Sequence, residues 1–549
     1  MAEIVLKVHP KDNVIVALKD LKKGQVVSYG GADFVLQEDI AAKHKFFTND
    51  MQTGDEIIMY GVLVGKAQEF IPRGGLMTTT NTKHAADPFE YRPYHYQWTP
   101  PDVSEFRDRT FNGYHRSDGR VGTANYWLFM PTVFCENRNL DVIREALHNE
   151  LGYAVTDKYK KYAHHLVAAF KNNEDISNLS LNAQPSGGSS NTDRLFKNVD
   201  GIKFLNHQGG CGGTRQDAGT LSKLLAAYAD HPNVAGITIL SLGCQNLQTK
   251  QLLEDIKLRN PSFDKPVLVF EQQQSQSEEQ LVADAIKQTF EGLIEANKIE
   301  RKPAPLTALT VGVKCGGSDG FSGISANPAV GYTSDLLAAL GAKILLAEFP
   351  ELCGAEQQLI DRTIDEAAAR KFIHLMTTYN DQALSVGSGF FMNPSPGNIK
   401  DGLITDAIKS TGAAKKGGTS PVVDVLDYTE PATKPGLSLV CTPGNDVEAT
   451  TGKAASGATL ILFTTGLGTP TGNPVCPTIK LATNTSLANR MGDIIDINTG
   501  GIIDGEKTIE EMGAEILEYC IRAASGEVVP KAVQLNQDDF IPWKRGVSL

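Results

Sequence analysis

The chain has 549 residues with 41% apolar and 21% charged side chains, which excludes a largely disordered protein and is enough for about three domains. Its formal net charge of −12 disfavours a nucleic-acid binder, because such a protein needs a basic surface. No segment has the roughly 18 apolar residues of a membrane helix, and the first residues lack the apolar core of a signal peptide. We therefore expect a cytoplasmic protein without a membrane partner.

Two regions precede the first clear alternation of strands and helices. Residues 1–81 contain short apolar runs separated by Gly, Asp and Lys, a pattern that predicts a small β-rich domain. Residues 82–108 are rich in Pro, Tyr, His and charge and have no periodicity. They are predicted to form an ordered linker whose aromatic side chains pack on the neighbouring domains.

Apolar strands alternate with amphipathic helices through the rest of the chain. Between 109 and 303, the apolar runs 124–133 and 234–243 are each followed by a helical pattern. A second set of such units fills 304–549 and includes a predicted helix over 508–526. This order predicts two Rossmann-like α/β domains, each with a mainly parallel sheet covered by helices on both faces.

Four of the eight cysteines each follow the end of an apolar strand; they are Cys135, Cys211, Cys244 and Cys315. Ligands of open α/β sheets bind outside the carboxyl ends of the strands, so the pattern predicts four sulfur atoms at one edge. Thiolates are soft ligands that suit iron–sulfur clusters and zinc, and the predicted cofactor is iron, either as a single ion (Fe²⁺) or as an iron–sulfur cluster. The alternative is that cysteines at strand ends are small buried apolar residues, which is what we expect of Cys353, Cys441, Cys476 and Cys520. At this low density, disulfides are not expected in a reducing compartment.

Two glycine-containing loops carry polar side chains that suit an anionic or hydroxyl-rich ligand. The first, 111–125, holds Arg116, Asp118, Arg120 and Asn125 just before a predicted strand. The second, 314–332, has Ser318 and Asp319 before a helix predicted to begin near Asn327, and a helix N-terminus behind glycines favours an anion. Ordinary polar turns remain the alternative. Neither loop matches the P-loop or the dinucleotide fingerprint, so nicotinamide binding is unsupported.

Several longer motifs resemble one known family. NHQGGCGG, LGCQNLQ, KCGGSDGFSGISANPAVGY, NPSPGN, TPGND and FTTG…PTIKLATNT are similar to motifs of the altronate dehydratase and galactarate dehydratase family. The first 80 residues resemble its SAF domain, a small β-clip module. The resemblance implies iron-dependent loss of water from a six-carbon sugar acid, giving a 2-keto-3-deoxy acid. It also implies a wider similarity to a sulfolactate sulfo-lyase, which eliminates sulfite.

The family's motif positions imply a set of site residues. Its cysteine positions match the four strand-end cysteines. Its loop positions match Arg116, Asp118, Asn125, His207, Asp319, Asn327, Glu351, Asn398, Asp446 and Lys480.

The chain departs from the family pattern at three places. A histidine-rich VHTHN-like stretch reads MTTTN, with Thr78 and Thr80, so the role of those histidines is absent or passes to others, such as His44 or His84. The family's TTGRG reads TTGLG, with Leu467, and its GAEH reads GAEQ.

A β-elimination needs a base for the proton next to the carboxylate, cations for the developing charge and a Lewis acid for the departing hydroxyl. His207 is the first candidate base or acid, with a role in supporting a ligand or capping a helix as the alternative, and Glu351 is the second. Lys480 is a further catalytic candidate and, with Arg116 and Arg120, could bind the substrate carboxylate.

The predicted substrate is D-altronate, converted to 2-dehydro-3-deoxy-D-gluconate, because Leu467 removes an arginine that would suit the second carboxylate of galactarate. Galactarate dehydration and a sulfolactate sulfo-lyase-like elimination are the enzymatic alternatives. An iron–sulfur electron carrier and a non-catalytic sugar-acid sensor are the alternatives without this chemistry. A homo-oligomer is compatible with the sequence.

Overall fold

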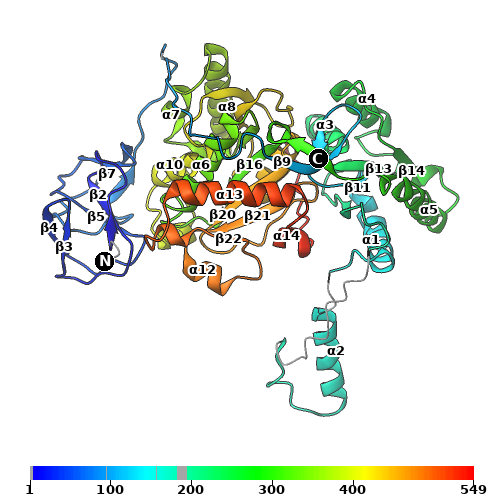
Figure 1. The fold of residues 1–549 in the computed structure, drawn as a ribbon, viewed down its shortest axis with the longest axis horizontal. Helices are drawn as coiled ribbons and strands as arrows, with labels where there is room; N and C mark the ends of the chain where they lie inside the picture. The colour runs from blue at the N-terminus through cyan, green and yellow to red at the C-terminus, as the bar shows by residue number, and fades with distance from the viewer. Residues whose placement is uncertain (1–3, 94, 156–157, 182–193) are drawn as a thin grey trace.

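The computed structural model describes residues 4–93, 95–155, 158–181 and 194–549, which form three regions in chain order (Figure 1). The N-terminal region, blue in Figure 1, consists of short antiparallel strands in three small sheets. Its strands are β1 (Val5–Leu6), β2 (Val14–Ala17), β3 (Val26–Tyr29), β4 (Ala32–Val35), β5 (Lys45–Phe47), β6 (Glu56–Met59), β7 (Val62–Ala67) and β8 (Thr82–His84). The predicted small β-rich domain is confirmed.

The second region holds a four-stranded parallel sheet in the order β12–β11–β13–β14. Its elements are β11 (Tyr126–Pro131), α1 (Asn137–Leu151), β12 (Gly201–Phe204), α3 (Arg215–Asp230), β13 (Val234–Ser241), α4 (Thr249–Arg259), β14 (Val267–Glu271) and α5 (Glu278–Ala296). Side chains of β11 alternate between faces, so that Trp127 and Phe129 pack with α1 and α5. Leu128 and Met130 pack with α3 and α4. Helices therefore cover both faces, as predicted.

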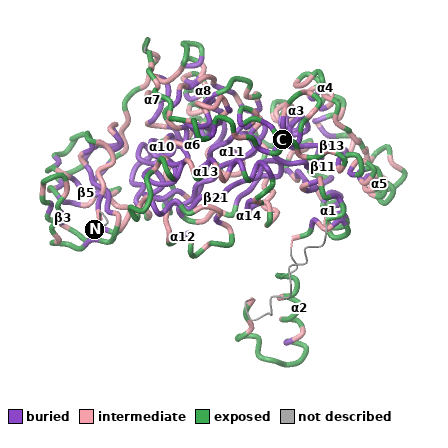
Figure 2. The backbone as a smooth tube through the Cα atoms, in the orientation of Figure 1, coloured by how far each residue is buried: buried purple, intermediate pink, exposed green. Residues whose placement is uncertain are grey.

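A small antiparallel sheet joins the chain where it enters and leaves this second region. β9 (Thr110–His115) pairs with β10 (Val121–Gly122) on one side and with β15 (Lys302–Pro305) on the other. The helix α2 (Lys158–Lys171) extends away from the sheet, and Figure 2 shows that it is mostly exposed.

The third region is a seven-stranded, fully parallel sheet in the order β18–β19–β17–β16–β20–β21–β22. Its strands are β16 (Thr310–Cys315), β17 (Lys343–Leu346), β18 (Val422–Leu426), β19 (Gly436–Val440), β20 (Leu460–Thr465), β21 (Thr478–Ala482) and β22 (Ile497–Asn498). Its helices are α6 (Ala326–Ala339), α7 (Glu356–Ile360), α8 (Glu366–Ser385), α9 (Pro396–Lys400), α10 (Asp406–Ala414), α11 (Asp446–Ala455), α12 (Thr485–Arg490), α13 (Ile509–Ala524) and α14 (Lys531–Gln534). The predicted α/β class is confirmed. None of the described helices combines the length and apolar character that crossing a membrane requires.

The two parallel sheets meet at the amino ends of their strands. The fully buried side-chain amide of Asn233, just before β13, donates to the carbonyl oxygens of Thr459 (3.1 Å) and Val475 (2.7 Å). The hydroxyl of Thr123 donates to the same Thr459 oxygen over 2.7 Å. The carboxyl ends of the two sheets therefore lie at the opposite ends of the strands from this junction.

Two further contacts connect the regions. Lys43 of the N-terminal region forms ion pairs of 3.0 Å with Asp319 and with Asp401 of the third region. The segment after α14 returns to the second region, where the backbone N–H of Leu549 donates to the carbonyl oxygen of Gly212 over 2.8 Å. The C-terminus thus lies beside the loop that carries Cys211.

Candidate active site

The strand order of the seven-stranded sheet reverses between β16 and β20. From β16 the chain continues to β17 on one side, whereas β20 begins the other side. Ligands of open parallel sheets bind in the crevice outside the carboxyl ends of the strands at such a point. Cys315 is the last residue of β16 and Thr465 the last of β20, so their following loops border this crevice.

Seven charged side chains meet beside Cys315 at this point. They are Lys314, Glu348, Glu351, Lys409, Lys416, Asp446 and Lys453, and with Cys315 we call them the lysine centre. Four of them are at most 1% exposed: Lys314, Glu348, Lys416 and Lys453. Because burying a charge without a partner is costly, ammonium and carboxylate groups have to compensate one another here.

Cys315 lies between an ammonium group and a carboxylate. The Nζ of Lys416 is 2.7 Å from its Sγ, and the Sγ is 3.6 Å from Oε2 of Glu351. Burial raises the pKa of the thiol, and the charge of Lys416 opposes this rise. The thiol is therefore already partnered within the protein.

Glu351 is ionised in this environment. Its Oε1 accepts a hydrogen bond of 3.0 Å from Lys409, which also donates to Asn393 over 2.9 Å. Burial alone would raise the pKa of Glu351, but Lys409 and the neighbouring lysines lower it overall. A carboxylate that is ionised at neutral pH is able to accept a proton.

Glu348 and Lys453 form the most buried part of the lysine centre. Glu348 forms an ion pair with Lys314, and its Oε2 lies 3.7 Å from the Nζ of Lys453 without hydrogen bonding. Among the residues that the structure describes, the Nζ of Lys453 has no hydrogen-bond partner, and burial lowers its pKa to about 8. An ammonium with this pKa can donate a proton near neutral pH.

No motif in the sequence singles out Lys314, Glu348, Lys409 and Lys416. One signal was present, because Lys314 interrupts the apolar run of β16 and a lysine in a buried strand needs an anionic partner. No local pattern distinguishes Lys409 or Lys416 from surface lysines, since they come into contact with Glu351 and Cys315 only through the fold.

The predicted residues of the 314–332 loop and its neighbours do lie at this end of the sheet. Asp446 forms an ion pair of 2.8 Å with Lys314, and the amide of Asn398 donates to the carbonyl oxygen of Ser318 over 2.7 Å. Asp319 is fully buried and pairs with Lys43. These contacts hold the loops to one another and to the N-terminal region.

The side chain of Asn327 also forms hydrogen bonds within the protein. Its amide donates to the carbonyl oxygen of Gly412 over 3.0 Å, and its Oδ1 accepts a hydrogen bond of 2.6 Å from Thr464. The helix α6 begins at Ala326, as predicted, and the Asn327 side chain uses its oxygen and one of its two N–H donors within the protein.

Three of the predicted cysteines lie on the other sheet. Cys135, Cys211 and Cys244 follow β11, β12 and β13, which are neighbours in the four-stranded sheet, and all three are exposed; we call them the cysteine edge. Cys315 is buried at the end of a strand in the seven-stranded sheet. The prediction of four sulfur atoms at one edge is therefore wrong, because the strands belong to two sheets. A site of three sulfur atoms stays a prediction.

A cavity of about 470 Å³ lies beside the cysteine edge. Glycines 209, 210, 212 and 213 line it together with His207, and the C-terminal residues Phe540, Trp543 and Leu549 close its other side. Its volume is within the range of small-molecule sites.

His207 supports the loop of the cysteine edge. Its Nε2 is 2.8 Å from the carbonyl oxygen of Pro131, and its Nδ1 accepts a hydrogen bond of 3.0 Å from the Gly209 backbone. Burial lowers its pKa to about 4, so the ring is neutral at physiological pH. With both ring nitrogens bound to backbone, His207 fits the supporting role better than the predicted role of base.

The four predicted residues of the 111–125 loop lie at the amino end of the four-stranded sheet. Arg120 pairs with Asp118 at 2.5 Å and with Asp230 at 2.6 Å. Arg116 donates to the carbonyl oxygen of Pro232 (2.7 Å) and to Asn125 (3.0 Å). The prediction of a carboxylate-binding loop is therefore corrected: protein groups occupy these donors, away from the carboxyl ends of the strands.

Lys480 is in the middle of β21 and not in the loop that its Gly- and Thr-rich surroundings predict. Its Nζ hydrogen-bonds Gln537 in the C-terminal segment, and burial lowers its pKa to about 8. The structure does not join Lys480 to the lysine centre.

Two groups of three side chains in the described part of the chain have all their possible metal-ligand atoms within 4.8 Å of one another. One is Cys315, Glu348 and Glu351, where lysines already pair with each group. The other is His84, Cys353 and Asp406, outside the lysine centre. The cysteine edge is not one of them, so its three sulfur atoms are farther apart than the ligands of a single ion.

The fold and these sites match one family along nearly the whole chain. The SAF domain of altronate/galactarate dehydratases matches residues 3–85, the second domain of D-galactarate dehydratase/altronate hydrolase matches 113–297, and the C-terminal domain of D-galactarate/altronate dehydratase matches 306–548. The chain belongs to this family of dehydratases, which are hydro-lyases, and the prediction of an enzyme of this class is confirmed.

Individual relatives include enzymes with different substrates. Altronate dehydratase of Bacillus subtilis is 33% identical over 99% of both chains, and altronate dehydratase of Escherichia coli is 32% identical over 99% of both. Galactarate dehydratase (L-threo-forming) of Escherichia coli is 33% identical over 95% of this chain and 93% of its own. The family is therefore shown, whereas identity alone does not select a substrate.

Proposed function

We propose that this enzyme removes water from D-altronate to give 2-dehydro-3-deoxy-D-gluconate in an iron-dependent reaction. The observation that carries the proposal is the lysine centre, in which ionised Glu351 and four lysines meet at the point where ligands of parallel sheets bind. The full-length similarity to two altronate dehydratases supports it.

The lysine centre contains the groups that a β-elimination requires. Glu351 accepts the proton from the carbon next to the carboxylate, while Lys409 and Lys416 stabilise the negative charge that develops on that carboxylate. The bond from the adjacent carbon to its hydroxyl then breaks, and Lys453 gives the departing hydroxide a proton to form water. The resulting enol converts to the 2-keto acid.

The substrate would reach this centre from the side of Asp446, Glu351 and Lys409. The side chain of Asp446 is 28% exposed, and those of Glu351 and Lys409 are each 9% exposed. The other lysines lie behind them, so a bound carboxylate would exchange one protein ion pair for another.

The cysteine edge fits iron by the chemistry of its donors. Three exposed thiols follow three neighbouring strands, and thiolates are the ligands of iron–sulfur centres, whose several iron atoms can be held by sulfur atoms that are too far apart for one ion. Cys135, Cys211 and Cys244 would hold the iron, while Cys315 is occupied by Lys416. Bound iron with an open position is a Lewis acid. Because the cysteine edge and the lysine centre lie at opposite ends of the two sheets, this iron would not contact the hydroxyl that leaves in the lysine centre, where Lys453 supplies the proton. That all eight cysteines are free supports a reducing compartment such as the cytoplasm.

The choice of altronate over galactarate is supported by the surroundings of Leu467. Its backbone N–H donates to the carbonyl oxygen of Gly317 over 3.1 Å, so it borders the crevice between β16 and β20. Three lysines could replace the missing arginine. Lys453 and Lys480 face Glu348 and Gln537 instead, whereas Lys400 is exposed and forms no ion pair within the described part of the chain. Galactarate has a second carboxylate that needs such a cation, whereas altronate has a hydroxymethyl group.

The test is a comparison of kcat/KM for the two acids after anaerobic reconstitution with ferrous iron and sulfide. We expect higher kcat/KM with D-altronate, since a lost charge-assisted contact costs about 10–150-fold. A preference for galactarate would overturn the substrate choice, and full activity without iron would overturn the iron dependence. As a control, Leu467→Arg is expected to raise kcat/KM for galactarate.

A further inference from the structure

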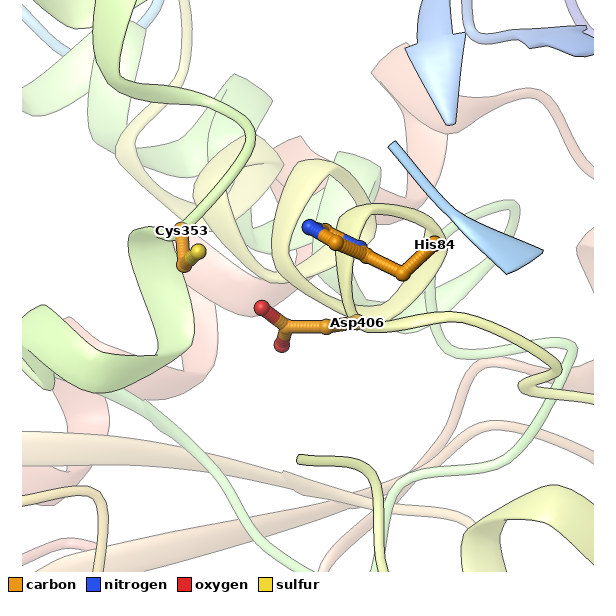
Figure 3. A group of neighbouring side chains, drawn as sticks. All are labelled: His84, Cys353 and Asp406. Carbon is orange, nitrogen blue, oxygen red and sulfur yellow. The ribbon is translucent and has the colours of Figure 1, made fainter. Parts of the chain in front are cut away.

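Three side chains from distant parts of the chain converge outside the lysine centre. His84 is the last residue of β8, Cys353 follows the short helix η5 (Phe349–Leu352), and Asp406 is the first residue of α10. Their ligand atoms all lie within 4.8 Å of one another. Figure 3 shows the imidazole, the thiol and the carboxylate directed toward a common space. The group bridges the N-terminal β-rich region and the seven-stranded sheet region.

One oxygen of the Asp406 carboxyl group is buried without a good hydrogen-bond donor in the described residues. Asp406 is 1% exposed, and its Oδ1 accepts a hydrogen bond of 3.2 Å from Ser410. Its carboxyl also interacts with the Cys353 thiol, and in the described part of the chain its Oδ2 meets no donor with full hydrogen-bond geometry. No lysine or arginine in the described residues forms an ion pair with Asp406 or with the buried Glu356 close by. Burial raises the pKa of Asp406 well above its ordinary value, which disfavours the charged carboxylate in the absence of a cation. The buried Oδ2 therefore has to be satisfied by a proton or by a cation, and the convergence of His84 and Cys353 on the same space favours a cation.

The charged groups near the Cys353 thiol are acidic as well. Burial first, and then the charges of Asp406 and Glu356, raise the pKa of the Cys353 thiol. A positive ion in the space between these groups would satisfy the orphaned oxygen and favour the thiolate. Binding would release the thiol proton to solvent, as metal binding to cysteine does.

His84 is available as the third ligand. In the described residues its ring makes one hydrogen bond, a long contact of 3.4 Å in which Nδ1 accepts from the Ala407 backbone. Little is lost if the ring takes the tautomer that a metal at Nε2 requires. Burial lowers the pKa of His84, which favours the neutral imidazole that metals bind.

The backbone is built for the close approach of these segments. Gly354 has a φ of +97°, and a Cβ there would lie 2.8 Å from the Cβ of Ala407. Glycine therefore allows the loop after η5 to lie directly on the first turn of α10.

We propose that His84, Cys353 and Asp406 form a binding site for a divalent cation of the zinc class, with a fourth position for water or Glu356. One sulfur, one imidazole nitrogen and one carboxylate oxygen are the donor types that Zn²⁺ takes in tetrahedral sites. This site shares no residue with the lysine centre or with the cysteine edge, and its test does not depend on the proposed dehydration.

An ion bound at this site would affect the neighbouring lysine centre. Cys353 is two residues after Glu351, and Asp406 is three residues before Lys409 in the same helix. Glu351 and Lys409 form the 3.0 Å ion pair at the open side of the lysine centre. The bound ion would hold both of their segments against β8 and so fix the geometry of that pair.

The experiment uses Co²⁺ as a spectroscopic probe in the full-length protein carrying Cys135→Ser, Cys211→Ser and Cys244→Ser, which removes the other exposed thiols. After treatment with a chelator under anaerobic conditions, we expect one Co²⁺ to bind with a thiolate-to-cobalt absorption band and to be displaced by Zn²⁺. Added to this background, Cys353→Ser should abolish the band. Asp406→Asn and the less buried His84→Gln should weaken binding by at least about 100-fold.

Cys441→Ser, which removes another buried thiol of the same region, is the matched control and should keep the band. Absence of the band in the background protein, or its persistence in Cys353→Ser, overturns the proposal. A band that disappears only with Cys315→Ser also overturns it, because the ion would then be in the lysine centre. As a second readout, Zn²⁺ should slow hydrogen exchange at 82–84 and 353–357 in the background protein but not in His84→Gln.

Discussion

The cysteine edge and the lysine centre place reactive side chains at the same topological position, the carboxyl ends of parallel strands, in opposite environments. The thiols of Cys135, Cys211 and Cys244 are exposed, whereas Cys315 is buried against Lys416 and Glu351. An exposed thiol without a charged partner is available to an external ion, whereas a buried one beside an ammonium is already compensated. The environment of a strand-end cysteine, more than its position, thus decides its chemistry.

The largest expected difference between variants of the cysteine edge and variants of the lysine centre is the loss of bound iron. We expect Cys211→Ser and Cys244→Ser to lose bound iron and activity after anaerobic reconstitution, because a hydroxyl does not replace an anionic soft donor. Cys315→Ser and Cys520→Ser should keep their iron, measured by mass spectrometry of the metal. Equal iron content in all four variants would contradict the assignment of iron to the cysteine edge.

The next effect concerns the lysine centre alone. Lys416→Met should lower kcat/KM by about 10²–10³-fold, the cost of removing one donor that stabilises developing charge. Its iron content should stay unchanged, in contrast to the cysteine variants. Lys434→Met, at a half-exposed lysine paired with Asp424, is the control. A decrease no larger than that of the control would contradict the role of the lysine centre.

A smaller effect is expected from the supporting histidine of the cysteine edge. His207→Gln should weaken iron binding by about 10–100-fold, as for other residues that hold a ligand from behind. Because the pKa of His207 is about 4, the pH profile of kcat between pH 6 and 8 should not change. Loss of a limb of that profile in the variant would instead restore His207 as a base.

The pH dependence of the lysine centre follows from Lys453. Burial lowers its pKa from 10.5 to about 8, so activity should fall above pH 8, by up to about tenfold per pH unit, as the proposed proton donor becomes neutral. The folded protein binds fewer protons than the unfolded chain between these two pKa values, so the Lys453 contribution to stability rises with pH in that range. In Lys453→Met, the alkaline limb of the kcat profile should be absent, and its persistence would assign the limb to another group.

The smallest effect on activity is expected at the amino end of the four-stranded sheet. Arg120→Ala leaves Asp118 and Asp230 without their shared partner and should destabilise the protein by about 1–3 kcal/mol in chemical unfolding. The KM for the substrate should not change, since Arg120 is away from both sites. A large rise in KM would support the original expectation of a carboxylate-binding loop.

The fold class was predictable because strand and helix patterns are local. The alternation after residue 109 predicts parallel sheets, and the four strand-end cysteines are correctly placed after strands. What no local pattern contains is the sheet to which each strand belongs. Cys315 was grouped with the other three for this reason, although β16 pairs with β17 and β20.

Side-chain partners from distant segments account for the remaining errors. In the sequence Arg120 resembles a ligand-binding arginine, because Asp230 is 110 residues away along the chain. In the fold, Asp230 lies 2.6 Å from Arg120 and forms an ion pair with it. Lys480 is surrounded by loop-forming residues in the sequence, but the fold makes it the middle of β21 and pairs it with Gln537. Conversely, Lys409 and Lys416 carry no sequence signal, because only tertiary packing brings them to Glu351 and Cys315.

The pairing of β9 with β15 affects how the four-stranded region could be deleted or replaced by a domain from another protein. Thr110 faces Pro305 and Gly113 faces Lys302, so the chain enters and leaves the four-stranded region at adjacent points, and a short turn could replace everything between them. Such a deletion would also remove Asn233, the donor to the carbonyl oxygens of Thr459 and Val475. A graft from another protein would therefore need a matching pair of strand ends and also groups that replace the contacts of Asn233 and of Thr123, His231 and Arg259 with the third region.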